Sequence, residues 1–108
     1  MTRVHVMSTT ADRLRGLLFS KPSKDTVMLV GCSDVHTFGM GYSLDLAFVD
    51  HRGVVMKSYR AVEPRCRVRC AGAAAALERA SQAALPWFMP GQFAGEAVRK
   101  GLKKRRKQ

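Results

Sequence analysis

His36 and Asp45 are the residues best suited to chemistry in the central part of the chain. Met40 and Gly41 predict a chain reversal between them, because glycine reaches backbone angles that cost other residues energy. Such a turn would make His36 and Asp45 cross-strand neighbours, and a carboxylate beside an imidazole favours the charged imidazole. The pair could act as a base and its orienting group, or, together with Cys32, as metal ligands. The alternative interpretation is structural: a buried histidine holds the hairpin, and Asp45 accepts hydrogen bonds from backbone amides.

Basic residues form the second candidate site. From Arg65 to Cys70 arginines alternate with apolar residues, and alternate residues of a strand share a face, so the sequence predicts a basic stripe. Residues 99–108 hold seven of the 19 Lys and Arg residues and no acid, which leaves +4 of the net charge of +11 on residues 1–98. Both segments favour sequence-independent, salt-sensitive binding of nucleic acid or another polyanion. The predicted contact residues are Arg65, Arg67, Arg69, Lys103, Lys104, Arg105, Arg106 and Lys107. The alternative is a solvated edge strand followed by a solubilising tail.

Three cysteines, Cys32, Cys66 and Cys70, bear on the cellular compartment and on metal binding. We expect neither a secretory signal nor a membrane span, and the odd number of cysteines favours reduced thiols in a cytoplasm. The chain has no CxxC pair, and no histidine stands at zinc-finger spacing from a cysteine. We therefore expect buried or half-buried thiols, and neither a metal nor a cofactor.

Alternation of apolar residues defines the elements that would position these groups. From Leu44 to Asp50 the two leucines and Phe48 fall on one face, which predicts a strand with an apolar inner side. Gly53 predicts a tight hairpin turn after this strand. The other expected strands are residues 1–7, 27–30, 54–62 and 66–70. We expect a short helix at 11–19 and an apolar loop at 85–91, and the alanines of 71–84 favour a helix. Residues 92–98 could form a last strand or begin a helix that runs into the tail.

Several of these segments, taken in order, resemble a known family. They are Arg15-Gly16-Leu17-Leu18-Phe19, the apolar run 27–30, His36-Thr37-Phe38-Gly39-Met40, Leu44-Asp45-Leu46-Ala47-Phe48-Val49-Asp50, Gly53-Val54-Val55 and Pro64. This pattern resembles the domain of unknown function 192 family over residues 10–93. Ala76-Leu77-Glu78 is similar to a Val-Leu-Glu strand of that family, and Pro90-Gly91-Gln92 is similar to its Pro-Gly-Asp turn.

The resemblance implies a compact β-rich domain of jelly-roll type with short helices. It implies a strand at Ala76–Glu78, where propensity favours a helix, and a buried ion pair between Glu78 and Arg15 if the two family positions are close. No established activity or ligand comes with the family, so the resemblance implies no catalytic residue.

We therefore expect a mainly β fold, an antiparallel sandwich or barrel of jelly-roll type with one or two short helices. Residues 1–98 would form a single domain, and residues 99–108 a disordered basic tail, because like charges repel and bury little. The expected function is that of a small cytoplasmic binding or accessory domain rather than an enzyme. Its candidate ligand-binding residues are His36, Asp45, Glu78 and Arg15, and the alternative metal ligands are Cys32, His36 and Asp45.

Overall fold

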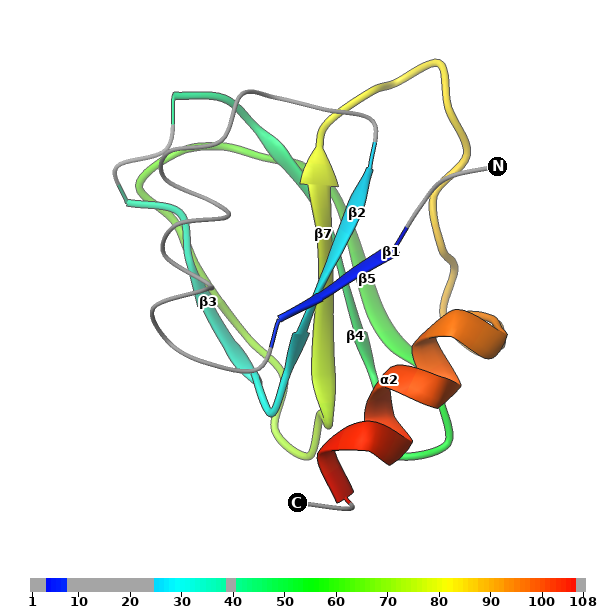
Figure 1. The fold of residues 1–108 in the computed structure, drawn as a ribbon. Coiled ribbons are helices and arrows are strands. Elements are labelled where there is room, and N and C mark those ends of the chain that lie inside the picture. Colours follow the sequence, from blue (N-terminus) through cyan, green and yellow to red (C-terminus); the bar gives the residue numbers. More distant parts are fainter. Residues whose placement is uncertain (1–3, 8–24, 39–40, 107–108) are drawn as a thin grey trace.

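The computed structural model describes residues 4–7, 25–38 and 41–106, and these contain seven strands and one helix (Figure 1). The strands are β1 (Val4–Met7), β2 (Thr26–Val30), β3 (Asp34–His36), β4 (Leu44–Val49), β5 (Val55–Val62), β6 (Arg67–Arg69) and β7 (Ala75–Ala80). The helix is α2 (Glu96–Arg106). The helix expected at 11–19, with Arg15, lies outside the described residues.

Five strands form one open sheet in the order β1-β2-β7-β4-β5, and β3 pairs with β6 in a separate two-stranded ribbon. β1 and β2 run parallel, whereas all other described pairs are antiparallel. The prediction of a mainly β, sandwich-like fold is confirmed, and the sheet does not close into a barrel. In the described part of the chain, no helix is long and apolar enough to cross a membrane.

Strand β4 lies inside the sheet, between β5 and β7, and all six of its residues are buried. The predicted alternation is confirmed, but both faces are covered. Leu46 and Phe48 point into a cluster that contains apolar residues of the ribbon. Ala47 and Val49 point to the other side, into a cluster that includes residues of α2.

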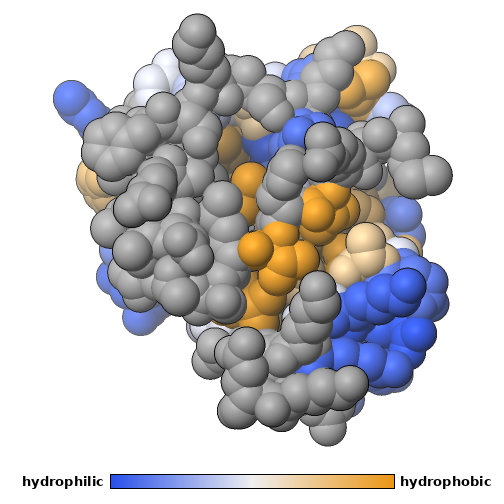
Figure 2. Space-filling view, viewed as in Figure 1, coloured by the Kyte–Doolittle hydropathy of each residue, from blue (hydrophilic) through white to orange (hydrophobic). Residues whose placement is uncertain are grey.

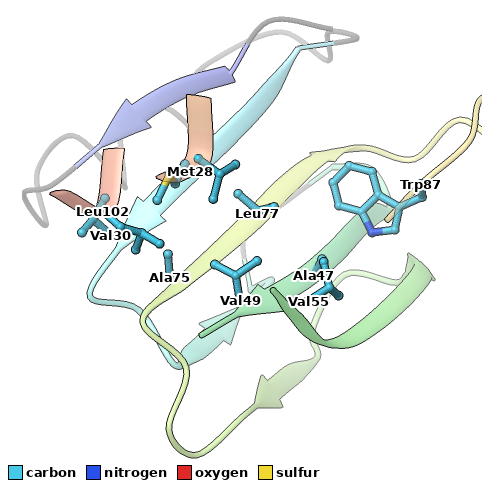
Figure 3. Close-up of a cluster of buried hydrophobic side chains, with 10 residues drawn as sticks. Met28, Val30, Ala47, Val49, Val55, Ala75, Leu77, Trp87 and Leu102 are labelled. Carbon is cyan, nitrogen blue, oxygen red and sulfur yellow. The ribbon is translucent and has the colours of Figure 1, made fainter. Parts of the chain in front are cut away.

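The molecule therefore has three layers, with the sheet in the middle. The β3–β6 ribbon packs on one face of the sheet. Helix α2 and the loop 85–93 cover the other face, with Leu102 and Trp87 as their buried side chains. Figure 3 shows this second face, where Leu102 lies near Met28 and Val30, and Trp87 covers the opposite end.

Helix α2 stands where we expected a disordered tail from residue 99. Val98 and Leu102, one helical turn apart, are 0% and 6% exposed and pack into the core. A Cβ at Gly101 would lie 2.9 Å from the sulfur of Met28 and 3.1 Å from Cγ2 of Val6, so the helix approaches the sheet closely. These three small or apolar positions at helical spacing dock the segment, and its charge alone did not reveal them. Residues 107 and 108 lie outside the described part.

Strand β7 confirms the strand implied by the family resemblance and corrects the helix favoured by the alanines. It pairs with β2 on one side and β4 on the other, and five of its six residues are buried. Helix propensities differ by at most about 0.7 kcal/mol per ordinary residue, so burial in the sheet outweighs them. The hairpin predicted after β4 is also confirmed, since Gly53 has a φ of 82° and donates to the Asp50 carbonyl at 3.0 Å.

Candidate functional site

The expected cross-strand pair of His36 and Asp45 does not form. His36 lies on β3 opposite Arg67 of β6, whereas Asp45 lies on β4 between β5 and β7. The His36 side chain is 52% exposed and the Asp45 side chain is 0% exposed. The two residues belong to different sheets because β3 joins the ribbon instead of folding back onto β4.

Asp45 is the centre of a buried hydrogen-bond network. Its Oδ1 accepts from the Ala61 amide at 3.1 Å and from Ser81 Oγ at 2.9 Å, and its Oδ2 accepts from Arg79 Nε at 3.0 Å. Burial opposes ionisation of Asp45, but these hydrogen bonds, with another from the Gln82 amide, hold its pKa below the usual range. Ala61 has a φ of 54° where the β4–β5 register shifts, so the carboxylate stabilises a bulge in β5.

Arg79 extends this network to the loop that covers the sheet. Its side chain is 3% exposed, it donates to the Leu85 carbonyl at 3.1 Å, and its guanidinium lies 4.7 Å from the Trp87 ring centroid. Trp87 Nε1 in turn donates to the Leu46 carbonyl at 2.9 Å. Asp45 thus fixes the bulge of β5 to β4, and Arg79 holds the loop against the sheet. The arrangement suits a structural role rather than proton transfer to a ligand.

Glu78 is enclosed as well, with 0% exposure, at the register position between Val27 of β2 and Leu46 of β4. Burial, and then the charge of Glu78, raise the pKa of Tyr42. Arg15 lies outside the described residues, so its ion pair with Glu78 stays a prediction. The structure does not gather the candidate ligand-binding residues on one concave face, because Asp45 and Glu78 lie in the core.

The alternative metal ligands are also not brought together. The buried Cys32 thiol donates to the Asp34 carbonyl at 3.3 Å, while Asp45 is enclosed by the network around Arg79. Within residues 4–7, 25–38 and 41–106, no three His, Cys, Asp or Glu side chains cluster as metal ligands would. All three cysteines of the chain are thiols.

One pocket of about 190 Å³ opens beside the loop that covers the sheet; its lining residues are Thr26, Pro86, Trp87, Phe88 and Gln92. Two of its polar groups are already engaged. Trp87 Nε1 donates to the Leu46 carbonyl, and Gln92 Oε1 accepts from the Met89 amide at 2.9 Å. Specific small-molecule sites combine apolar walls with polar groups that converge on the ligand, and this pocket supplies mainly the walls.

The outer face of the β3–β6 ribbon carries charged groups in a defined geometry. Cross-strand partners share a face, and the register pairs Asp34 with Arg69 and His36 with Arg67. Arg67 holds the Asp34 carboxylate through both Nε, at 3.0 Å, and Nη2. Arg69 Nε and His36 Nε2 each lie 3.6 Å from the same carboxylate. The pKa of Asp34 is lowered, mainly by its hydrogen bond with Arg67.

Two further residues extend this face. Phe38 is 56% exposed, and its ring centroid is 6.1 Å from that of His36. Arg65, at the turn into β6, is exposed and has a φ of 64°, a left-handed conformation that costs a non-glycine residue about 1–2 kcal/mol. Sequence reasoning found the arginines and missed Phe38, although the alternation from residue 34 to 38 was a usable signal. We call this set the outer ribbon face: Asp34, His36, Phe38, Arg65, Arg67 and Arg69.

The other predicted polyanion-binding residues lie on α2. Lys103 is exposed, the helix backbone continues through residues 104–106, and Lys107 lies outside the described part. α2 and the ribbon cover opposite faces of the sheet, so they form no continuous basic surface. Figure 1 shows this separation, with β3 on the left and α2 at the lower right.

These observations define a small open β-sandwich whose buried polar residues serve the fold, with no assignable activity. The chain belongs to the DUF192 family, described as an uncharacterized ACR, whose family model matches residues 1–87. The resemblance seen in the sequence is thereby confirmed. No curated protein matches the chain.

Two solved structures share the fold. One is a protein of unknown function from Novosphingobium aromaticivorans, with 20% identity and a TM-score of 0.62, and the match covers 74% of this chain and 64% of that chain. The other is a proposed transcription regulator from Sinorhizobium meliloti, with 15% identity and a TM-score of 0.62, covering 72% and 67%. The chain thus spans less than two thirds of the Novosphingobium protein.

Proposed function

We propose that this protein is a small binding domain for single-stranded nucleic acid and that the outer ribbon face is its contact surface. The observation that carries the proposal is an exposed aromatic ring, Phe38, beside three exposed arginines, of which two contact the carboxylate of Asp34. Proteins that bind single strands without sequence preference combine a positive surface for the phosphates with aromatic rings on which bases stack.

The arginines of this face are available to a phosphate. The side chains of Arg67 and Arg69 are 46% and 69% exposed, and exposed ion pairs such as that of Arg67 with Asp34 contribute little to stability. A guanidinium can transfer its paired hydrogen bonds from a carboxylate to a phosphate, because both offer two oxygens at suitable spacing. Phosphate contacts would therefore replace the Asp34 contacts at small cost.

The charge of the whole chain supports the same proposal. Its net charge is +11, and four described acids already pair with arginines; these acids are Asp34, Asp45, Asp50 and Glu96. The charges left without a partner are therefore mostly those of Lys and Arg. This positive excess raises the rate at which a polyanion meets the protein. We also place the domain in the cytoplasm, where three thiols such as those of this chain stay reduced.

The test is fluorescence anisotropy with a labelled oligothymidine and a labelled duplex, at low and at physiological salt. Each phosphate contact to a single strand contributes about 5-fold to affinity at 0.1 M salt, from a salt slope of about −0.7 per contact. Arg67→Gln with Arg69→Gln should therefore weaken binding about 25-fold. Arg52→Gln is the matched control, because Arg52 is also an exposed arginine paired with an aspartate, Asp50, at 3.0 Å.

Two more variants separate the proposal from general charge effects. Phe38→Ala should weaken oligothymidine binding by about 1–3 kcal/mol and leave duplex binding unchanged, because only unpaired bases can stack on the ring. Asp34→Asn should tighten binding several-fold, since it removes the carboxylate that contacts Arg67 and Arg69. Asp50→Asn raises the net charge by the same amount in the hairpin after β4 and should leave binding unchanged, so a gain confined to Asp34→Asn is diagnostic. Equal affinity of wild type, Phe38→Ala and Asp34→Asn would overturn the proposal.

A further inference from the structure

Helix α2 presents a second cationic surface, apart from the outer ribbon face. Its sequence contains six Lys and Arg residues and one acid, Glu96, so six positive charges against one negative leave +5. Glu96 pairs with Arg99 at 2.7 Å, whereas Lys100 and Lys103 are exposed and have no described carboxylate within ion-pair distance. Figure 2 shows hydrophilic surface at the position of α2, at the lower right.

The packing of α2 indicates what kind of polyanion fits it. A basic amphipathic helix binds anionic lipid when its apolar face is free to enter the headgroup region. In α2 that face is occupied, because Val98 and Leu102 are buried in the core and Gly101 abuts Met28. Only the charged side of the helix is available, which suits a hydrophilic polyanion such as nucleic acid.

The two cationic surfaces can act independently. The ribbon and α2 pack on opposite faces of the sheet, and layers packed face to face are spaced about 10 Å apart, which puts roughly 20 Å between their backbones. Charges are screened over about 8 Å at physiological ionic strength. Phosphates held on one side therefore repel phosphates on the other side only weakly.

We infer that the protein holds two nucleic-acid segments at once, one on the outer ribbon face and one on α2, and so bridges strands. This inference rests on the proposed function of the ribbon and adds a second site to it. Neither site alone produces bridging, so the two can be tested separately.

The test uses the full chain and two oligothymidines, one labelled with a donor dye and one with an acceptor, which cannot pair with each other. Wild type, added below the strand concentration, should produce energy transfer between the strands. Lys100→Gln with Lys103→Gln should reduce the affinity of the second strand about 25-fold at 0.1 M salt, by the same salt slope per contact. Glutamine is a good helix former and the docking residues remain, so α2 should persist, as circular dichroism will verify.

Stacking on Phe38 makes the ribbon the tighter site, so anisotropy with the labelled strand at limiting concentration reports the ribbon. This reading should change less than twofold in the α2 variant. Lys57→Gln, which removes an exposed lysine of β5, should leave both the energy transfer and the anisotropy unchanged. If wild type binds a strand through the ribbon but gives no energy transfer, bridging is overturned while the proposed function stands. Energy transfer that survives the α2 substitutions would also overturn it, because self-association of the protein would then join the strands.

Anionic lipid is the competing occupant of α2. Vesicles of phosphatidylserine and phosphatidylcholine are sedimented with the wild type and with the Lys100→Gln, Lys103→Gln variant. Equal and weak sedimentation of both proteins supports nucleic acid as the occupant. Sedimentation that depends on these lysines, with no energy transfer between strands, would assign the helix to a membrane surface and overturn the inference.

Discussion

Replacing Asp45 with asparagine should destabilise the fold strongly, because it leaves the Arg79 guanidinium buried without its counter-charge. The Asp45 and Arg79 side chains are 0% and 3% exposed, and their ion pair spans 3.0 Å. Removing one partner of a buried ion pair costs about 3–5 kcal/mol. At about 4–8 °C per kcal/mol for a domain of this size, the melting temperature should fall by about 12 °C or more, as measured by calorimetry.

The difference in the free energy of unfolding between the wild type and Asp45→Asn should also shrink in acid. The folded-state pKa of Asp45 is lowered, so its stabilisation is complete above the unfolded pKa of about 3.9 and is lost as pH falls through the lower folded value. The asparagine side chain of the variant does not titrate, and the other carboxylates with a lowered pKa occur in both proteins, so their effects cancel in the difference. Urea unfolding of both proteins, near neutral pH and below about pH 4, measures this difference in the free energy of unfolding.

Asp50→Asn is the matched control for this prediction. Asp50 also pairs with an arginine at 3.0 Å, but its side chain is 18% exposed and that of Arg52 is 68% exposed. Loss of its charge should therefore cost only about 1–2 kcal/mol, including the hydrogen bonds from the turn amides. A cost below about 1 kcal/mol for Asp45→Asn, or a cost that persists in acid, would refute the role of Asp45 and Arg79 in holding β5 and the loop.

Three further substitutions test the packing of α2, the hydrogen bond of Trp87 and the backbone strain at Arg65. Leu102→Ala should cost about 2–5 kcal/mol in urea unfolding and loosen α2, because it empties a buried site. Trp87→Phe should cost about 1–3 kcal/mol, since the Leu46 carbonyl loses its donor; circular dichroism must follow it, because Trp87 is the only tryptophan. Arg65→Gly should raise the melting temperature, because glycine adopts the φ of 64° without the strain of about 1 kcal/mol that another residue bears. The same substitution should weaken oligothymidine binding in anisotropy, because it removes an arginine of the outer ribbon face.

The strands could be predicted because their signals are local. Alternation in β4 and the apolar run of β2 each indicate a strand within a few residues, and the structure has both. Strand β7 was different, because its alanines favour a helix and only its burial between β2 and β4 makes it a strand. The resemblance to a family supplied the long-range information that propensity lacks.

The candidate site was harder to predict because strand pairing is a long-range choice. The sequence places His36 and Asp45 on either side of a turn, but β3 pairs with β6, which follows β5 in the chain. The alternation of the arginines was visible, whereas the exposure of Phe38 depends on which layer covers the ribbon. The sequence allowed a helix to begin within residues 92–98, but the charge of residues 99–108 concealed that it continues, docked by Val98 and Leu102.

The position of the carboxylates bears directly on the proposed binding surface. Asp45 lies in the core and Asp50 in a hairpin, so neither reduces the charge of the outer ribbon face. Asp34 does carry a carboxylate on that face, and it contacts both Arg67 and Arg69. One negative charge cannot neutralise three arginines, but it can hold two guanidinium groups side by side. We therefore expect Asp34 to moderate affinity rather than to abolish it, and for that reason Asp34→Asn should strengthen binding.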